Sequence, residues 1–206
     1  MFKRPIIVFE GIEGSGKSLH IKNVSKYLKS QNIPFIKLRE PGGSKNSEKI
    51  RRLILNNNST FSKKTDLLLY FAARNENIEK IISKNYKKKV ILIDRFTDST
   101  IAYQHYGMKF DKKIIQIINK YLLKNISISF TFLHIVSKKN LINRLNRRKN
   151  LNKYDKFNNS FYQNVQNGFV KLSNKNKSKY LLINSSNTIN YNKKLIINKI
   201  KKLTQK

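Results

Sequence analysis

A cluster of glycines near the start of the chain constrains its fold more than any other feature. Residues 10–18 read EGIEGSGKS, directly after the apolar run PIIVF, and they hold three of only seven glycines in 206 residues. The stretch GIEGSGKS matches the pattern G-x-x-x-x-G-K-[ST] at every defined position, between a strand-like and a helix-like segment. This context predicts an α/β fold in which the first strand runs into a phosphate-binding loop.

The residue types of this loop suit the binding of a triphosphate. Glycine lets the backbone adopt conformations that other residues resist, so that successive N–H groups can point at an anion. The N-terminal end of the following helix adds positive potential. We therefore expect the loop to hold the ATP phosphates through Gly11, Ile12, Glu13, Gly14, Ser15, Gly16, Lys17 and Ser18. Lys17 can reach the β- and γ-phosphates, and the Ser18 hydroxyl can coordinate Mg²⁺.

Short apolar runs alternate with helix-like stretches along the whole chain. Strands are expected at residues 6–9, 34–38, 90–93, 128–136 and 180–183, and helices at 18–31, 64–84, 111–124, 138–148, 158–173 and 190–203. The runs lack strict alternation, which indicates burial on both faces of a parallel sheet. The order predicts a three-layer P-loop NTPase fold, a five-stranded parallel sheet flanked by helices, in one domain of residues 1–206. The polar segment 149–159 is expected to be a mobile loop.

The chain is strongly basic, with 44 Lys and Arg against 11 Asp and Glu, a formal net charge of +33. Such a charge suits binding to nucleic acid or an anionic membrane. Lys, Asn and Ile are abundant everywhere, however, and the basic residues do not cluster. We therefore interpret the charge as a compositional bias, and we expect no nucleic-acid partner and no membrane partner. Nucleotides would still be attracted, and salt would weaken that attraction.

The start of the chain and its lack of cysteine indicate in which cellular compartment the protein is expected. The opening MFKRPIIVFEG has an apolar run too short for a signal peptide, and no stretch approaches the roughly 18 apolar residues of a membrane span. The chain has no cysteine, which excludes disulfides and a cysteine nucleophile. We expect a cytoplasmic protein.

Three further blocks place charged or aromatic residues where ligands bind in α/β proteins. The block LREPGGS puts Arg39 at the end of the second strand, where its fork of donors could clamp a phosphate. The block LLLYFAAR puts Tyr70 and Arg74 on one helical face, where they could stack on a base and bind its edge. The run VILIDRF ends a strand with Asp94, suited to Mg²⁺, and Arg95, suited to a phosphate. Each residue could instead be an ordinary core aromatic or surface charge.

Two other features concern the same region. Glu13 lies inside the phosphate loop, where its charge would repel an anion unless it faces away or binds a hydroxyl or hydrated magnesium. The stretch TDSTIAYQ, residues 97–104, offers Ser99, Thr100, Tyr103 and Gln104 as polar groups on a short helix.

Taken together, these blocks resemble the thymidylate kinase family in its bacterial form, which has no arginine inside the phosphate loop. The matching pieces are FEGIEGSGKS, REPGGS, EKIRRLIL, LLYFAAR, DRF and STIAYQ, in the family's order and over nearly the whole chain. The resemblance implies transfer of the γ-phosphoryl group of ATP to dTMP with Mg²⁺, giving dTDP and ADP. It also implies a homodimer, through the helices expected at 64–84 and 111–124.

The resemblance further implies where the acceptor phosphate and sugar would be held. Arg39 and Arg95 would hold the dTMP phosphate, with Arg51 nearby. Glu13 would contact the deoxyribose 3′-hydroxyl or the water shell of the magnesium. Tyr103 would crowd the 2′ position and so disfavour a ribonucleotide.

By the same resemblance, the base would lie on Tyr70, at a position that the family usually fills with Phe. Arg74 would donate a hydrogen bond to the edge of thymine. Ser99 and Thr100 would line the base pocket.

The resemblance places a lid at residues 144–157. Family members that lack an arginine in the phosphate loop supply cations from the lid, commonly in the pattern D-R-x-E. The corresponding stretch here is NKYD, with Lys153 where Arg is expected, so that Arg147 and Arg148 are alternative sources of charge. We expect the catalytic cations to come from Lys17, Arg95, Arg147, Arg148 and Lys153.

Three alternatives stay open on the sequence alone. Another P-loop kinase of small nucleotides or nucleosides would use a different acceptor. An ATPase stimulated by nucleic acid is favoured only by the net charge. A non-catalytic relative would be consistent with the altered lid, although the intact GSGKS and DRF pieces speak against it.

Overall fold

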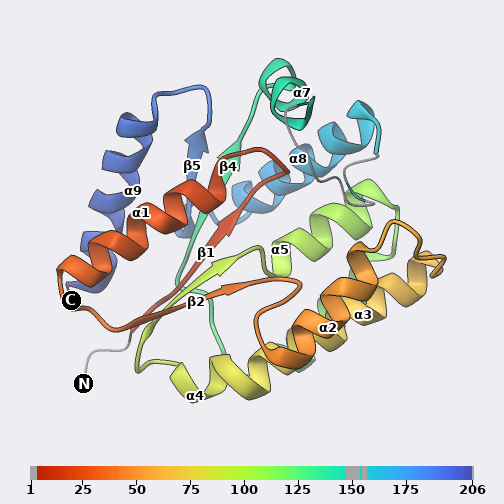
Figure 1. Ribbon diagram of the computed structural model, residues 1–206, viewed down its shortest axis with the longest axis horizontal. Coiled ribbons are helices and arrows are strands. Elements are labelled where there is room, and N and C mark those ends of the chain that lie inside the picture. Colours follow the sequence, from red (N-terminus) through yellow and green to blue (C-terminus); the bar gives the residue numbers. More distant parts are fainter. Residues whose placement is uncertain (1–3, 147–153, 155–156, 206) are drawn as a thin grey trace.

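Within the residues that the computed structural model describes, 4–146, 154 and 157–205, five strands form one parallel sheet. The strand order is β2-β3-β1-β4-β5. The strands are β1 (Ile6–Glu10), β2 (Phe35–Arg39), β3 (Val90–Asp94), β4 (Phe130–Ile135) and β5 (Tyr180–Asn184). All five predicted strands are confirmed, and so is the predicted α/β class with helices on both sides of a parallel sheet (Figure 1).

Helices connect the strands along the described part of the chain. They are α1 (Lys17–Ser30), α2 (Lys45–Leu55), α3 (Lys63–Asn77), the π-helix η1 (Ile78–Ile82), α4 (Ser83–Asn85), α5 (Thr97–Thr100), the π-helix η2 (Ile101–Gly107), α6 (Lys112–Leu123), α7 (Lys138–Asn146), α8 (Asn159–Asn174), the 3₁₀-helix η4 (Lys177–Lys179) and α9 (Ile189–Thr204). Among these described helices, none has the length and apolar character needed to cross a bilayer.

Two helical regions differ from expectation. The single helix expected at 64–84 is interrupted, because α3 passes into the π-helix η1 before the short α4. Helix α2, with the sequence KNSEKIRRLIL, was not among the expected helices. It begins where the Ser44 side chain accepts a hydrogen bond from the Ser47 N–H, which satisfies a free donor of the first turn.

The central strands are buried because helices cover both faces of the sheet. Alternate residues of a strand point to opposite faces. Ile7 and Phe9 of β1 therefore pack in one cluster with residues of α1 and α9, while Ile6 and Val8 pack in another with residues of η1. Figure 1 shows α1 and α9 side by side on one side of the sheet. This double burial explains why the runs of β1 and β3 contain no alternating polar residues.

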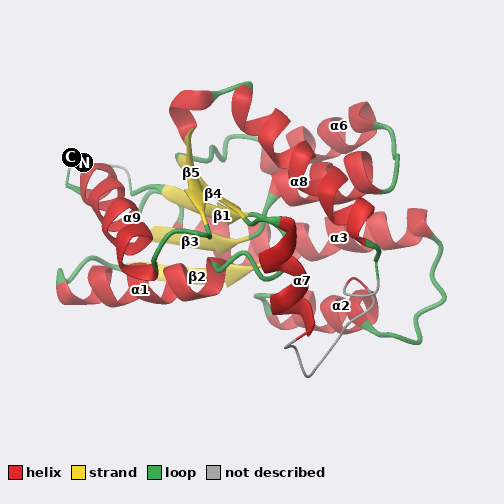
Figure 2. Ribbon diagram, turned by 90° about the horizontal axis from the view of Figure 1, so that it is seen from above, coloured by secondary structure: helices red, strands yellow, loops and turns green. Residues whose placement is uncertain are grey.

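Helices α3, α6 and α8 gather in a separate group away from α1 and α9 (Figure 2). In this group η2 packs against α8, and two glycines allow the close approach. A Cβ atom on Gly168 would lie 2.5 Å from a ring carbon of Tyr106, and one on Gly107 would lie 2.6 Å from a ring carbon of Phe161. The contact fixes η2, which carries Tyr103 into a buried cluster with Phe161 and Phe169.

We predict that Gly168→Ala destabilises the protein. Alanine gains about 1 kcal/mol over glycine inside a helix, but overpacking against Tyr106 costs about 1–3 kcal/mol. The free energy of unfolding in urea should therefore fall by up to about 2 kcal/mol. The matched control is Asn167→Ala, at the next and exposed position of α8, which should be neutral or slightly stabilising. A more stable Gly168→Ala variant would contradict the tight contact.

Candidate active site

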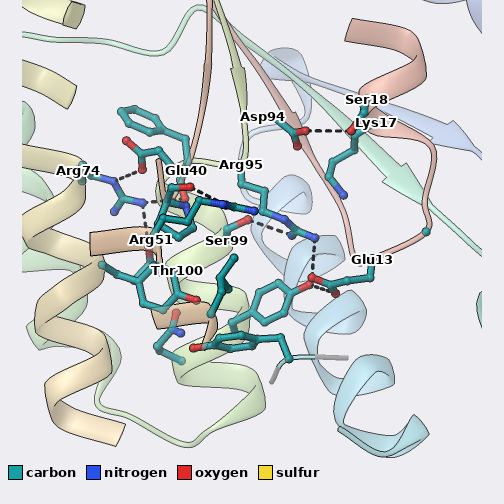
Figure 3. A pocket seen from close by; sticks show the side chains of 18 of the residues that line it. Glu13, Lys17, Ser18, Glu40, Arg51, Arg74, Asp94, Arg95, Ser99 and Thr100 are labelled. Atoms are coloured by element: carbon teal, nitrogen blue, oxygen red, sulfur yellow. Dashed lines mark hydrogen bonds and ion pairs between the residues drawn. The ribbon is translucent and has the colours of Figure 1, made fainter. Parts of the chain in front are cut away.

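A pocket of about 400 Å³ lies at the carboxyl ends of β1, β2 and β3, the edge of a parallel α/β sheet where ligands bind. It brings together most of the predicted site residues, which come from distant parts of the chain (Figure 3). Those that line it are Glu13, Gly14, Lys17, Ser18, Arg51, Tyr70, Arg74, Asp94, Arg95, Ser99, Thr100 and Tyr103.

The phosphate loop joins β1 to α1 and needs glycine at two positions in particular. Gly11 has φ +137°, and a Cβ atom there would lie 2.3 Å from the carbonyl oxygen of His134. Gly16, directly before α1, has φ +90°, a left-handed conformation that other residues rarely adopt. Nothing lies within 4 Å of where its Cβ would be. The loop is therefore open to a ligand at the start of α1.

Lys17 is buried and engaged by the loop itself. Its ammonium group donates to the carbonyl oxygens of Gly11 and Ile12, both at 2.9 Å, and to the Ser15 hydroxyl at 3.3 Å. Burial, with the nearby charge of Arg95, lowers the pKa of Lys17 to about 8. The side chain therefore stays mostly protonated near neutral pH, and a bound phosphate would have to replace some of these loop oxygens.

Ser18 and Asp94 meet across the loop, as expected for a magnesium site. The Ser18 hydroxyl donates to Asp94 Oδ2 at 3.2 Å. The other oxygen, Oδ1, is buried and has no hydrogen-bond partner among the described residues. Both side chains offer the hard oxygen ligands that Mg²⁺ prefers, and this ion usually takes only one or two protein ligands beside water and substrate phosphates. The residues present therefore fit Mg²⁺.

Glu13 is neutralised by two side chains of the pocket. Arg95 Nη2 donates to Glu13 Oε1 at 2.9 Å, and the Tyr103 hydroxyl donates to Oε2. The Arg95 guanidinium also lies over the Tyr103 ring, 5.2 Å from its centroid. Burial alone would raise the pKa of Glu13, but the charges of Arg95 and Lys17 lower it below its ordinary value. Because the Glu13 carboxylate is paired with Arg95, it adds no net repulsion for an anion bound in the phosphate loop.

Sequence reasoning missed Glu10, which holds the segment that carries Arg95. Glu10 Oε1 accepts hydrogen bonds from the backbone N–H groups of Phe96 at 2.8 Å and Ser99 at 3.2 Å, and Oε2 accepts one from the Ser99 hydroxyl at 2.6 Å. Arg95 adopts φ 66°, which is uncommon outside glycine. The sequence does contain a signal for Glu10: it is a carboxylate at the end of an otherwise fully apolar strand.

Two predicted acceptor residues lie on helices that face the pocket. Arg51, on α2, donates to the Pro41 carbonyl oxygen at 2.6 Å, and burial lowers its pKa. Tyr70, on α3, lies edge-on to the ring of Tyr154, with centroids 6.1 Å apart. Tyr154 lines the pocket too. It was not singled out from the sequence, because nothing in its local pattern reveals contacts with distant rings.

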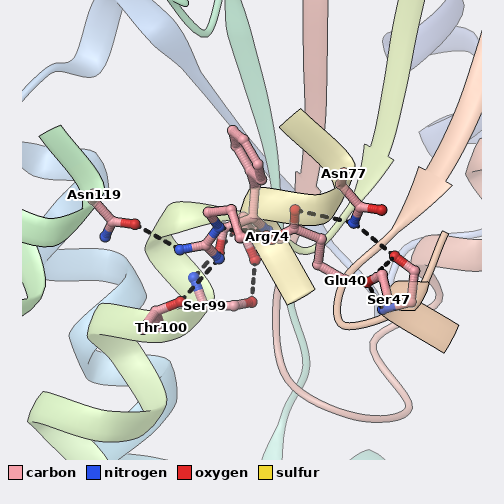
Figure 4. A network of polar contacts seen from close by, with 10 residues as sticks. Glu40, Ser47, Arg74, Asn77, Ser99, Thr100 and Asn119 are labelled. Carbon is pink, nitrogen blue, oxygen red and sulfur yellow. Dashed lines mark hydrogen bonds and ion pairs between the residues drawn. The ribbon is translucent and has the colours of Figure 1, made fainter. Parts of the chain in front are cut away.

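The spacing of Tyr70 and Arg74 on one helical face suggested that Arg74 is available to a base. Instead, Arg74 is deeply buried, with 2% of its surface exposed. Its Nε donates to Glu40 Oε2 at 2.8 Å, Nη1 to Asn119 Oδ1 at 2.6 Å, and Nη2 to both the Phe96 carbonyl oxygen and Thr100 Oγ1. Four of its five N–H groups are thus used within the protein. Figure 4 shows this guanidinium between Asn119 and Glu40.

Arg39 lies outside the residues that line the pocket. Its guanidinium makes a two-pronged contact with Glu48, through Nε at 3.2 Å and Nη2 at 3.0 Å, and 56% of its side chain is exposed. A role of Arg39 in holding the acceptor phosphate stays a prediction, and it would require Arg39 to exchange Glu48 for that phosphate.

The predicted lid cations Arg147, Arg148 and Lys153 lie outside the described residues, as does most of the predicted lid. The structure shows a cation that sequence reasoning did not nominate, Arg144 near the end of α7. It donates to the carbonyl oxygen of Gly14 at 2.7 Å and to that of Ser185 at 3.0 Å. Arg144 therefore ties the phosphate loop to the segment that follows β5.

Fold and pocket together define a class. A phosphate loop, a fitting magnesium pair and a second group of cations share one pocket at the sheet edge, where two phosphorylated groups could meet. This combination defines a P-loop kinase of small nucleotides.

Comparisons with known proteins give the family. Residues 9–196 match the family model described as thymidylate kinase. A thymidylate kinase of Thermosipho africanus is 36% identical over 89% of this chain and 90% of its own, and one of Acholeplasma laidlawii is 34% identical over 95% and 98%. The solved thymidylate kinase of Ehrlichia chaffeensis superimposes with a TM-score of 0.78 at 29% identity, covering 97% of this chain and 99% of its own. The chain belongs to the thymidylate kinase family.

We predict a pH-dependent stability difference between the protein and its Glu10→Gln variant. Burial raises the pKa of Glu10 from 4.5 to about 7, and the charge of Asp98 adds to this. Because the folded protein binds this proton more tightly than the unfolded chain, stability falls as the pH rises from the lower to the higher value. Glutamine does not titrate. The free energy of unfolding of the wild type, relative to Glu10→Gln, should therefore fall by about 3 kcal/mol over this window.

Urea unfolding from about pH 4 to about pH 8 measures this difference. The control is Glu79→Gln, which removes an exposed carboxylate and should show little pH dependence. A wild-type-to-Glu10→Gln difference that stays constant with pH would contradict the proton on the buried carboxylate.

Proposed function

We propose that this protein transfers the γ-phosphoryl group of ATP to dTMP, forming ADP and dTDP. The observation that carries the proposal is the single pocket in which the phosphate loop faces Arg51, Arg95 and the ring of Tyr70. Membership of the thymidylate kinase family supports dTMP as the acceptor. The catalytic unit is one nucleoside monophosphate kinase domain, residues 1–206, acting in the cytoplasm without nucleic acid or membrane.

The donor is held by the phosphate loop. Residues 11–18 surround the triphosphate with backbone N–H groups, and Lys17 turns from the loop oxygens to the β- and γ-phosphates. Ser18 and Asp94 would hold Mg²⁺, partly through water. When bound, Mg²⁺ neutralises negative charge on the phosphates.

The acceptor is held on the opposite side of the pocket. Arg95 and Arg51 bind its phosphate, and Tyr70 stacks on its base. The remaining N–H of Arg74 donates to the base edge, so that the base must offer an acceptor such as a keto oxygen. Ser99 and Thr100 complete this wall.

The sugar lies between these two groups. Glu13 accepts a hydrogen bond from the 3′-hydroxyl or from water around the magnesium, and Tyr103 crowds the 2′ position.

The reaction needs alignment and charge neutralisation more than acid–base chemistry. A phosphate oxygen of dTMP forms a bond to the γ-phosphorus, and the bond from that phosphorus to the β–γ bridging oxygen breaks, leaving ADP. The acceptor oxygen is already ionised, so no strong base is required. Lys17 and Arg95 neutralise charge from the pocket, and Arg147, Arg148 and Lys153 do so from a lid at residues 144–157. Exclusion of water then prevents wasteful hydrolysis of ATP.

An acceptor panel tests the proposal. With ATP and Mg²⁺, the protein should convert dTMP with the highest kcat/KM among dTMP, dUMP, dCMP, UMP, CMP, AMP and thymidine. We assign the contact of Arg74 to the C4 edge of the base, where cytosine carries an amino group in place of the keto oxygen. Cytosine nucleotides should therefore react poorly. Lys17→Ala should lower kcat by about 10²-fold or more, as expected when a charge aimed at the reacting phosphates is removed.

Other results would point elsewhere. Faster conversion of a different acceptor would indicate another P-loop kinase. ATP hydrolysis stimulated by DNA or RNA, without conversion of dTMP, would favour a nucleic-acid-dependent ATPase. A protein that neither binds nor converts dTMP would refute the proposed function.

We also propose that two copies associate through α3 and α6. These helices expose Leu68 on α3 and Ile114, Ile117 and Tyr121 on α6, with exposed fractions of 61%, 52%, 66% and 70%. The three α6 residues recur at helical spacing and share one face. Since α3 packs against α6, this association face extends over both helices. Exposed apolar side chains gathered on one helix face are typical of interaction sites.

We predict that Ile117→Glu weakens self-association at least about tenfold, because a charge at the centre of the association face would be buried on pairing. Sedimentation analysis over a range of concentrations measures the effect. The matched control, Gln116→Glu, adds the same charge one position around the helix and should associate more nearly like the wild type. Equal association of wild type and Ile117→Glu would place the interface elsewhere.

A further inference from the structure

Asn119 differs from the other described partners of Arg74. Glu40, Phe96 and Thr100 line the pocket, whereas Asn119 does not. It comes from α6, and its carbonyl oxygen accepts a hydrogen bond from Arg74 Nη1 at 2.6 Å, between two buried side chains. Figure 4 shows Asn119 reaching Arg74 from the side opposite Glu40. Within the described part of the chain, its hydrogen bond to the lining of the pocket is therefore made to Arg74 alone.

Among the residues that the structure describes, the partners of Arg74 leave one of its donors for a ligand. A guanidinium has five N–H groups. Nε donates to Glu40, and the two N–H groups of Nη2 donate to the Phe96 carbonyl oxygen and to Thr100. Nη1 donates one hydrogen to Asn119, so the single remaining N–H lies on the nitrogen that Asn119 holds. Loss of the Asn119 oxygen would leave two N–H groups on Nη1 and remove the contact that holds the Nη1 end of the guanidinium plane.

The choice of asparagine agrees with such a role. The buried charge of Arg74 is already balanced by Glu40 at 2.8 Å, so a carboxylate at position 119 would add a second negative charge to a buried site. The Asn119 Nδ2 is itself buried and has no partner among the described residues. An unsatisfied buried donor is costly. A residue needed only to fill space would be apolar here, as neighbouring Ile115 is.

We propose that Asn119 is a positioning residue for recognition of the acceptor base: it directs the last free N–H of Arg74 at a keto oxygen of the base. This inference rests on the proposed function. Asn119 touches no substrate and acts through Arg74 alone. Its removal should therefore affect the acceptor and leave the donor nucleotide unaffected.

Steady-state kinetics of Asn119→Leu, which keeps the branched shape of the side chain and removes the oxygen, tests the proposal. The KM for dTMP should rise about tenfold, while kcat and the KM for ATP change by less than about twofold. The preference for dTMP over dCMP, as a ratio of kcat/KM values, should fall about tenfold. Asn119→Asp keeps an oxygen that can accept from Nη1 and should retain most of the preference.

The stability control is Ile115→Ala, a buried position on the same helix. It should lower the melting temperature without changing the preference for dTMP. Should Asn119→Leu not fold, Asn119→Ser replaces it, because its short side chain cannot reach Arg74 and should give the same kinetic change.

Several outcomes would overturn the proposal. One is a folded Asn119→Leu or Asn119→Ser variant with an unchanged KM for dTMP and unchanged preference. Another is a folded Asn119→Asp variant that loses the preference as fully as Asn119→Leu. These results are distinct from failure of the proposed function, which would appear as a wild-type protein that leaves dTMP unconverted.

Discussion

The pairing of β1 with β3 is the constraint on which the rest of the site depends. In the parallel register Phe9 lies opposite Asp94, and the Arg95 N–H donates to the Phe9 carbonyl oxygen at 3.0 Å. The phosphate loop and the DRF segment, about 80 residues apart in the chain, therefore leave the sheet side by side. The other contacts that build the site are then made between near neighbours in space. Glu10 accepts hydrogen bonds from the backbone beyond Arg95, and Arg95 donates to Glu13. Ser18, in the first turn of α1, donates to Asp94.

Buried carboxylates hold the cations of the pocket in place. The chain carries only 11 acidic residues, yet Glu13 pairs with Arg95 and Glu40 pairs with Arg74 inside the site. Such pairs are expensive to bury, but they fix the guanidinium groups before a ligand arrives. A preformed arrangement of donors is what electrostatic catalysis requires, since little reorganisation remains for the reaction. Glu10 has no paired cation in direct contact among the described residues: it is held by hydrogen bonds from Phe96 and Ser99, and burial raises its pKa to about 7.

The sequence predicted the parts of this structure that depend on local pattern. Apolar runs located all five strands, and the glycine motif located the phosphate loop, because both signals lie within a few residues. The burial of Arg74 could not be read in this way, since its partners Glu40 and Asn119 lie 34 and 45 residues distant. Nor could the pairing of Arg39 with Glu48, which depends on how α2 packs beside β2. Glu10 and Arg144 were missed because single charged residues at the end of a strand or helix resemble ordinary surface charges.

Helix α6 links two properties that seem unrelated in the sequence. Its inward face carries Ile115 and Asn119, which contact the core and Arg74, while its outward face exposes Ile117 and Tyr121, part of the proposed association face. A helix packed on one side only can shift relative to α3 more easily than one covered on both sides. Since the hydrogen bond between Asn119 and Arg74 spans only 2.6 Å, a shift of about 1 Å along the helix would break it. Pairing through the proposed association face would add contacts on the side of α6 that lies away from Asn119.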